Sequence, residues 1–265
     1  MRHTALRDKL EEFYNTYTCK RYVDPDPLLF LYNYPDKKDR EVAGFIAASL
    51  AYGRVEMIMK TVGQVLDRLG KHPAAFLRRT TKKDLAGMFQ GFVYRFARED
   101  HLVGLLWGLR RVMTAFSSLE ACFESGLAEE DETIVSGLTF LSDQIRGRAG
   151  LGHLLADPKK RSACKRSHLF LRWMVRSDKV DPGGWDRISP ARLVVPLDRH
   201  MHTAGTILGF TRRRNADLKT ALEITQGFRA LNPRDPVKYD FCLTRLGIRR
   251  EMSMETLREI REECQ

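Results

Sequence analysis

Residues 193–210 read LVVPLDRHMHTAGTILGF, a short apolar run that meets Pro196 and then passes into a helical pattern. Apolar side chains then recur at the spacing of one helix face, at Met201, Ala204, Ile207 and Leu208. Gly209 is a residue type that commonly ends helices. Asp198 precedes the pattern, where a carboxylate accepts the unpaired N–H groups of a first helical turn and is stabilised by the helix dipole. The stretch therefore predicts a helix that is packed on one side and begins at a charged Asp198.

A second helix is predicted over residues 162–176, which read SACKRSHLFLRWMVR. On a helical wheel Lys165, Arg172 and Arg176 fall on one narrow strip, because they are spaced by seven and eleven residues. The other sides are largely apolar. Such a strip either lines a cleft or is a solvent stripe whose long side chains lie along the surface.

Helical periodicity also dominates the rest of the chain. Residues 4–18 and 55–70 are amphipathic, while residues 39–51 are apolar nearly all round and predict a buried helix. Residues 83–98 and 101–116 complete the pattern as two further predicted helices. The fold class expected from this reading is all-α.

The chain is basic, with a formal net charge of +11. An excess of this size favours a polyanionic partner, although nucleic-acid, ribosomal and membrane-surface proteins all share it. Residues 117–144 are locally acidic, so we expect one basic face and one neutral or acidic face. Three consecutive arginines at 212–214 are candidates for contacts with phosphate.

Cysteine and histidine spacing argues against a metal or cofactor. The five cysteines, Cys19, Cys122, Cys164, Cys242 and Cys264, are scattered and odd in number, which is typical of a reducing compartment and not of a disulfide framework, zinc site or iron–sulfur cluster. His200 and His202 point about 200° apart on a helix, so they do not share one ion. No apolar run reaches membrane-spanning length and no signal peptide is evident. A cytoplasmic protein without a cofactor is expected.

Residues 195–200, VPLDRH, resemble the V-P/A-V-D-T-H segment of the helix-hairpin-helix (HhH-GPD) DNA glycosylase superfamily, to which endonuclease III belongs. The resemblance implies that Asp198 is a catalytic carboxylate. It also places Lys165 at the position of the lysine that attacks the sugar and forms a Schiff base, a step that needs a neutral amine. The segments ACKRSHLFLRWMVR and NPRDPVKYDFCLTRLGI resemble an uncharacterised bacterial family of unknown function, which we expect to be a distant branch of that superfamily.

The chain departs from the glycosylase pattern at two places. The glycine-rich hairpin that precedes the lysine is absent, so Lys159, Lys160 and Arg161 would have to hold phosphate by charge. An insertion at residues 177–192 carries Trp185, which either stacks on a flipped base or anchors the loop in the core. Tyr52 and Arg54 stand where the glycosylases have a loop that inserts into the duplex, although an ordinary helix–helix turn explains them equally well.

The resemblance implies two helical lobes with a central cleft. Residues 1–38 and 199–265 would form the terminal lobe, and residues 39–198 the central lobe with the Lys165 helix and the 177–192 insertion. The residues assigned to nucleic-acid binding are Tyr52, Arg54, Lys159, Lys160, Arg161, Arg166, Arg172, Arg176, Trp185, His200, Arg212, Arg213 and Arg214.

The leading hypothesis is a DNA N-glycosylase-like protein of DNA repair, acting on a flipped, damaged base, with Asp198 and Lys165 as catalytic residues. Whether it is an enzyme, and whether it also cleaves the abasic site, stay open. The alternative is a nucleic-acid-binding protein that keeps the helical scaffold without catalysis, on DNA or RNA. A protein-interaction scaffold with an acidic partner is a third hypothesis.

Overall fold

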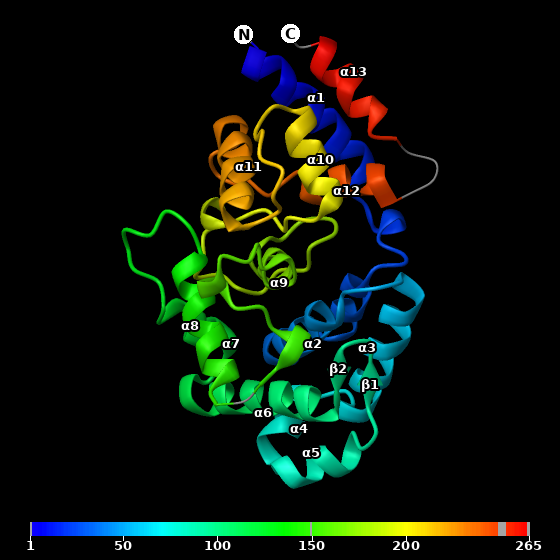
Figure 1. The fold of residues 1–265 in the computed structure, drawn as a ribbon, viewed down its shortest axis with the longest axis vertical. Helices are drawn as coiled ribbons and strands as arrows, with labels where there is room; N and C mark the ends of the chain where they lie inside the picture. The colour runs from blue at the N-terminus through cyan, green and yellow to red at the C-terminus, as the bar shows by residue number, and fades with distance from the viewer. Residues whose placement is uncertain (1, 149, 249–252, 264–265) are drawn as a thin grey trace. The chain divides into compact units, whose positions relative to one another are not determined.

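The computed structural model describes residues 2–148, 150–248 and 253–263. These residues are mostly helical, as the sequence predicts, and the chain divides into two compact units (Figure 1). The middle unit is Pro25–Lys159, and the terminal unit joins Met1–Asp24 to Lys160–Gln265. No helix in the described ranges is long and apolar enough to cross a membrane.

The terminal unit consists of helices from both ends of the chain. Its helices are α1 (Arg2–Tyr17), α9 (Lys165–Val175), α10 (Arg199–Ile207), α11 (Leu218–Leu231), α12 (Asp240–Ile248) and α13 (Glu255–Glu263). Helix α1 packs against α11, α12 and α13, and α10 packs against the same three helices (Figure 1). The two ends of the chain are thereby joined in one folded body.

The middle unit surrounds a buried helix, as residues 39–51 predict. Its elements are α2 (Lys37–Leu50), α3 (Val55–Leu69), α4 (Pro73–Arg79), α5 (Lys82–Met88), β1 (Val93–Tyr94), β2 (Ala97–Arg98), α6 (Glu99–Phe116), α7 (Leu119–Glu124) and α8 (Val135–Arg146). Every residue of α2 from 41 to 50 is buried. The carboxylate of Glu41 accepts hydrogen bonds from the N–H groups of Leu119 and Glu120, so it caps α7 from inside the core.

One predicted helix is wrong in its second half. Residues 83–98 were expected to be helical throughout, but α5 ends at Met88 and an antiparallel hairpin follows, in which Val93 pairs with Arg98 and Tyr94 with Ala97. Phe92, Val93, Tyr94 and Phe96 are residue types enriched in strands, and this local preference for extended backbone overrides the helical spacing of the apolar residues.

The boundaries of the two units also differ from the expected lobes. The changes of unit fall at residues 24/25 and 159/160. Helix α9 and the 177–192 segment, expected in the central lobe, therefore belong to the terminal unit. The reason is a set of ion pairs that joins α9 to residues near α12.

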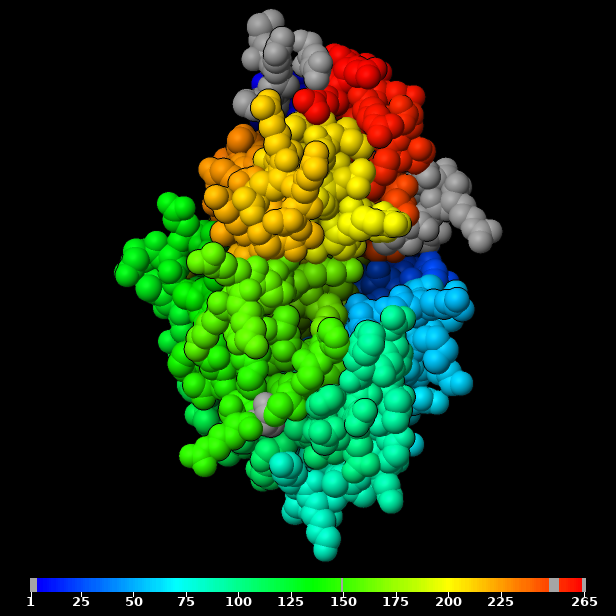
Figure 2. Space-filling model, in the orientation of Figure 1, coloured from blue at the N-terminus to red at the C-terminus, as the bar shows by residue number. Residues whose placement is uncertain are grey.

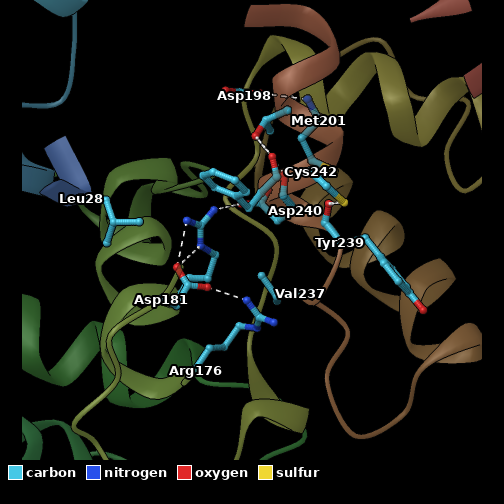
Figure 3. Close-up of polar contacts among 12 residues, drawn as sticks. Leu28, Arg176, Asp181, Asp198, Met201, Val237, Tyr239, Asp240 and Cys242 are labelled. Carbon is cyan, nitrogen blue, oxygen red and sulfur yellow. Dashed lines mark hydrogen bonds and ion pairs between the residues drawn. The ribbon is translucent and has the colours of Figure 1, made fainter. Parts of the chain in front are cut away.

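These ion pairs form a buried cluster of two guanidinium and four carboxylate groups. Arg172 contacts Asp181 at 3.0 Å and also pairs with Asp240. Arg176 contacts Asp235 and Asp178, both at 2.9 Å, and pairs with Asp181. Figure 3 shows Asp181 beside Arg176. The side chains of Arg172, Arg176, Asp181 and Asp240 are at most 4% exposed.

The cluster corrects the sequence interpretation of α9. Arg172 and Arg176 were expected to form an accessible cationic strip that contacts nucleic acid, but both are buried and held by carboxylates. Four aspartates supply more negative charge than two arginines offset, and burial raises the pKa of Asp181 and of Asp240. The strip is therefore an internal brace for α9.

His168 lies on the same helix and is 1% exposed. Neither of its ring nitrogens has a hydrogen-bond partner among the described residues. Burial lowers the pKa of His168 to about 4, from an ordinary value of 6.5. The folded protein therefore holds this imidazole neutral at pH values where the unfolded chain binds a proton.

Removing one guanidinium tests the internal brace. In Arg172→Met a side chain of similar length leaves Asp181 and Asp240 without their shared cation. We expect the free energy of unfolding, measured by urea denaturation, to fall by about 3–5 kcal/mol. Lys179→Met, at an exposed position, is the control and should change it by less than about 0.5 kcal/mol. Equal free energies of unfolding for the two variants would show that the ion-pair cluster does not stabilise the fold.

The neutral His168 predicts a pH dependence of stability. Between pH 6.5 and about 4 the unfolded chain binds one more proton at this residue than the folded protein. The free energy of unfolding should therefore fall as the pH is lowered through this window, by on the order of 3 kcal/mol from His168 alone. His168→Phe should flatten that part of the stability profile, measured by urea denaturation at stepped pH. An unchanged slope would contradict the assignment.

Candidate active site

Asp198 begins α10 as the sequence predicts. Its Oδ1 accepts a hydrogen bond from the Met201 N–H at 2.8 Å (Figure 3). Its backbone carbonyl accepts one from the His202 N–H at 2.8 Å. The preceding residues, 193–197, are all buried. The apolar run therefore anchors the chain, and the helix N-terminus holds the carboxylate at the edge of the core.

Lys165 lies directly against this carboxylate. Its Nζ is 3.3 Å from Asp198 Oδ2, and the two side chains are 38% and 19% exposed. Asp198 thus uses one oxygen for the helix cap and the other for the amine. The structure brings together, from positions 33 residues apart, the two residues that the sequence singled out as catalytic.

The start of α9 is locally unfavourable in two ways. Lys165 is the first residue of the helix, where the positive end of the dipole disfavours a cation. Cys164 before it adopts a left-handed conformation with φ 43°, which costs a residue with a Cβ about 1–2 kcal/mol. The Cys164 side chain makes no capping hydrogen bond. The Asp198 carboxylate offsets the first of these costs by placing a negative charge beside the amine.

A second carboxylate, that of Asp240, lies near enough to Asp198 to be affected by its charge. Burial raises the pKa of Asp240, attraction to Arg172 opposes the rise, and the charge of nearby Asp198 adds to it. The Oδ1 atom of Asp240 has no hydrogen-bond partner within the described part of the chain. Arg172 is paired with Asp181 and Asp240, so its charge is compensated within the core.

Two segments rich in arginine and lysine adjoin, along the chain, the helices that carry the pair: one precedes α9 and the other follows α10. Residues 160–162 are joined to α11 by a bridge between Ser162 and Asp217 and by a hydrogen bond from Leu218 N–H to the Arg161 carbonyl. The segment after α10 is held by the ring of His202, whose Nε2 is 2.8 Å from the Arg213 carbonyl. The exposed cationic side chains on these segments are Lys160, Arg161, Arg212 and Arg214.

These four residues, named here the basic rim, are part of the molecular surface. Residues near 212–214 belong to the yellow part of the surface in Figure 2. Arg161 has φ 58°, so this segment holds a second left-handed residue close to Lys165. The terminal unit thus carries exposed positive charge on the segments adjoining both members of the Lys165–Asp198 pair.

The other candidate cations have partners of their own. Arg213 is half-buried, pairs with Asp217 at 2.7 Å and donates to Thr220 Oγ1 at 2.9 Å, so the expected triplet of phosphate contacts is reduced to Arg212 and Arg214. Lys159 is exposed but pairs with Asp143 at 2.6 Å within the middle unit. Arg166 is half-buried and follows Lys165 directly.

Trp185 and His200 are packing residues. Trp185 is 2% exposed, and its ring meets Phe170 edge-on at 5.4 Å between centroids. The prediction that it stacks on a base is wrong, and its alternative, a core anchor for the 177–192 segment, is confirmed. His200 is half-buried, with its ring so close to Gly247 that a Cβ there would lie 1.9 Å from Nδ1.

Tyr52 and Arg54 belong to the middle unit, in the turn between α2 and α3. Arg54 is exposed, and Tyr52 is half-buried beside Tyr94, with ring centroids 5.0 Å apart. The contact with the β1–β2 hairpin makes this more than an ordinary helix–helix turn.

Among the described residues, no group of three histidine, cysteine, aspartate or glutamate side chains is arranged to hold a metal ion. Cys242 is buried, and burial raises its thiol pKa to about 12, so the thiol is unreactive at neutral pH. Cys264 lies outside the described residues.

Sequence reasoning missed two members of this environment. Asp240 belongs to the site through its ion pair with Arg172. No local sequence pattern links it to Asp198, 42 positions earlier, or to Lys165, 75 positions earlier. Cys164 adopts a left-handed conformation that its residue type does not signal. Only the tertiary fold reveals either of them.

Comparison with known proteins identifies the family. Residues 26–249 match the model of a family described as a protein of unknown function (DUF2400). No curated protein and no solved structure matches the chain significantly. Because the match covers most of the chain, the expectation of a family of unknown function is confirmed, while the link to the glycosylase superfamily stays a prediction. The chain belongs to the DUF2400 family.

Proposed function

We propose that the terminal unit is a DNA N-glycosylase-like catalytic body acting on a damaged or modified base in DNA. The observation that carries the proposal is the Lys165–Asp198 pair, with 3.3 Å between Nζ and Oδ2 and both side chains partly exposed. An amine and a carboxylate in contact can act on one sugar carbon. The exposed cations of the basic rim suit the phosphates on either side of such a sugar.

Each member of the pair has a distinct role in the proposed reaction. Lys165 gives one proton to solvent and its free amine attacks the sugar carbon that bears the base. The bond from this carbon to the base breaks, the base leaves with the bonding electrons and takes up a proton, and the nitrogen of the new C–N bond loses the second amine proton to solvent. Asp198 stabilises the positive charge that develops on the sugar, and its contact with Nζ orients the amine. If the amine does not attack, water takes its place and the protein only removes the base.

A second candidate function is nucleic-acid binding without catalysis. It is favoured by the segment before Lys165, where a 3-10 helix at Pro158–Lys160 stands in place of the glycine hairpin of the glycosylases. Binding would then rest on the charge of the basic rim, and the Lys165–Asp198 pair would serve only to join two helices. DNA and RNA are both possible ligands under this alternative.

Borohydride trapping tests the catalytic proposal. After Lys165 has displaced the base, the bond from the same sugar carbon to the ring oxygen breaks and that oxygen takes up a proton. The resulting iminium ion is reduced by borohydride to a stable amine that joins protein and DNA. We expect a cross-linked band with at least one duplex from a panel of base lesions. Lys165→Ala should abolish the band, because the attacking amine is gone. Asp198→Asn should slow its formation by about a hundredfold or more, since the developing charge loses its counter-ion.

Lys219→Ala is the matched control, because Lys219 is an exposed lysine at the start of α11 and should trap as the wild type does. If no lesion gives a cross-link, base release is measured by strand cleavage in hot alkali. Failure of both assays on every lesion would refute catalysis.

Salt dependence tests the binding that both candidate functions require. The logarithm of the association constant for DNA should fall linearly with the logarithm of salt concentration. Arg212→Ala and Arg214→Ala should each reduce the slope by about 0.9, because each removes one phosphate contact. Lys179→Ala, at an exposed position away from the rim segments, should leave it unchanged. Equal slopes for all variants would exclude the basic rim as the DNA-binding surface.

A further inference from the structure

The middle unit carries an exposed aromatic and basic surface at the tip of the β1–β2 hairpin. Phe96 at the tip is 60% exposed and Val93 is 72% exposed. Arg95, beside Phe96, is also exposed, with its guanidinium carbon 5.7 Å from the Phe96 ring centroid. The hairpin segment lies on the visible surface in the aquamarine part of Figure 2.

The hairpin is held firmly at its base. Tyr94 donates a hydrogen bond to the Tyr52 carbonyl, and the Tyr52 hydroxyl donates to the Tyr94 carbonyl at 3.2 Å. The Tyr94 side chain is buried, while Val93 and Arg98 project from the opposite face of the ribbon. The exposed tip is therefore presented by a rigid support.

Aromatic side chains continue from the tip across the surface. The Phe96 ring lies 4.8 Å from the His153 ring at an interplanar angle of 40°, and the Tyr52 ring lies 6.3 Å from the same imidazole. The Arg95 side chain lies over Gly53, so close that a Cβ added to Gly53 would be 3.0 Å from it. Gly53 has φ 107°, so this position requires glycine both for its conformation and for the close approach.

The charges around the tip are mainly positive. Arg54, Arg95 and Arg98 are exposed, while the first turn of α3 adds Glu56 and the start of α6 adds the exposed Asp100. The Glu99 carboxylate accepts a hydrogen bond from Gly91 N–H at 2.8 Å, which directs it to the base of the hairpin. An exposed aromatic ring with a guanidinium beside it matches the chemistry of a nucleotide, with an aromatic base and an anionic phosphate.

We propose that the β1–β2 hairpin binds an unpaired nucleotide, with the base stacked on Phe96 and the phosphate against Arg95 or Arg54. The inference rests on the proposed function in one respect, namely that the ligand of the chain is a nucleic acid. The inference goes beyond the proposed function in two ways. It assigns a second binding surface, and it specifies that the bound strand is unpaired there, because only an unpaired base offers a free face to Phe96. A protein partner would use Phe96 as an apolar contact and would not need an aromatic ring.

Binding of a labelled single-stranded oligonucleotide, followed by fluorescence anisotropy at low salt, tests this proposal. Phe96→Ala should weaken binding about tenfold, within the range measured for loss of one base–aromatic stack. Phe96→Leu keeps an apolar side chain without a π face and should weaken binding to a similar extent. Phe96→Trp should restore it, and its indole fluorescence should be quenched when the oligonucleotide is added.

Val93→Ala is the matched control, because Val93 is more exposed than Phe96 on the same ribbon and has no ring. Its affinity should stay within about twofold of the wild type. Full affinity in Phe96→Ala or in Phe96→Leu would overturn the proposal.

The same oligonucleotide in duplex form separates this proposal from the proposed function. In one outcome, duplex binding depends on Arg212 and Arg214 but not on Phe96, and Phe96→Ala binds the single strand as the wild type does. This outcome would overturn the hairpin proposal and leave the proposed function standing. Absence of binding to both forms would overturn the hairpin proposal and the proposed function together.

Discussion

The terminal unit depends on the desolvation of two guanidinium groups on α9. Arg172 and Arg176 are buried beneath the surface, where an unpaired charge costs several kcal/mol, so the fold must supply carboxylates in fixed positions. Asp178 and Asp181 come from the loop after α9, Asp235 from the segment before α12, and Asp240 is the first residue of α12. Meeting this requirement fixes α9 against both segments and thereby determines where its first residue, Lys165, lies.

The cluster also explains how the two units differ from the lobes expected from sequence. A buried ion pair tolerates little displacement, because separation of the charges leaves each without compensation. Four aspartates within the terminal unit therefore hold α9 to that unit. The Trp185–Phe170 contact adds apolar packing to the same loop, so the 177–192 insertion is an integral part of the core.

Features set by neighbouring residues, such as helix caps and buried helix faces, were predictable from the sequence. Contacts between side chains far apart in the sequence were not. The cap at Asp198, the buried α2 and the core alternative for Trp185 follow from residue type and period. The same helical wheel misassigned Arg172 and Arg176, because it shows which side chains share a strip and not what faces them. Similarly, the β1–β2 hairpin has only two residues in each strand, and Arg95–Phe96 is not a turn sequence that signals a hairpin.

The contact between Lys165 and Asp198 was anticipated only through the resemblance to the glycosylase superfamily. A pair exposed to this degree adds at most about 1 kcal/mol to stability. Against it stand a cation at a helix N-terminus and a left-handed Cys164, whose combined cost is at least as large. The Lys165–Asp198 contact therefore adds little or no net stability at the start of α9. Local conflicts of this kind concentrate where a side chain must be held for chemistry or binding. The buried cluster supplies the rigidity that the start of α9 lacks, and it keeps an energetically unfavoured amine within reach of a carboxylate and of solvent.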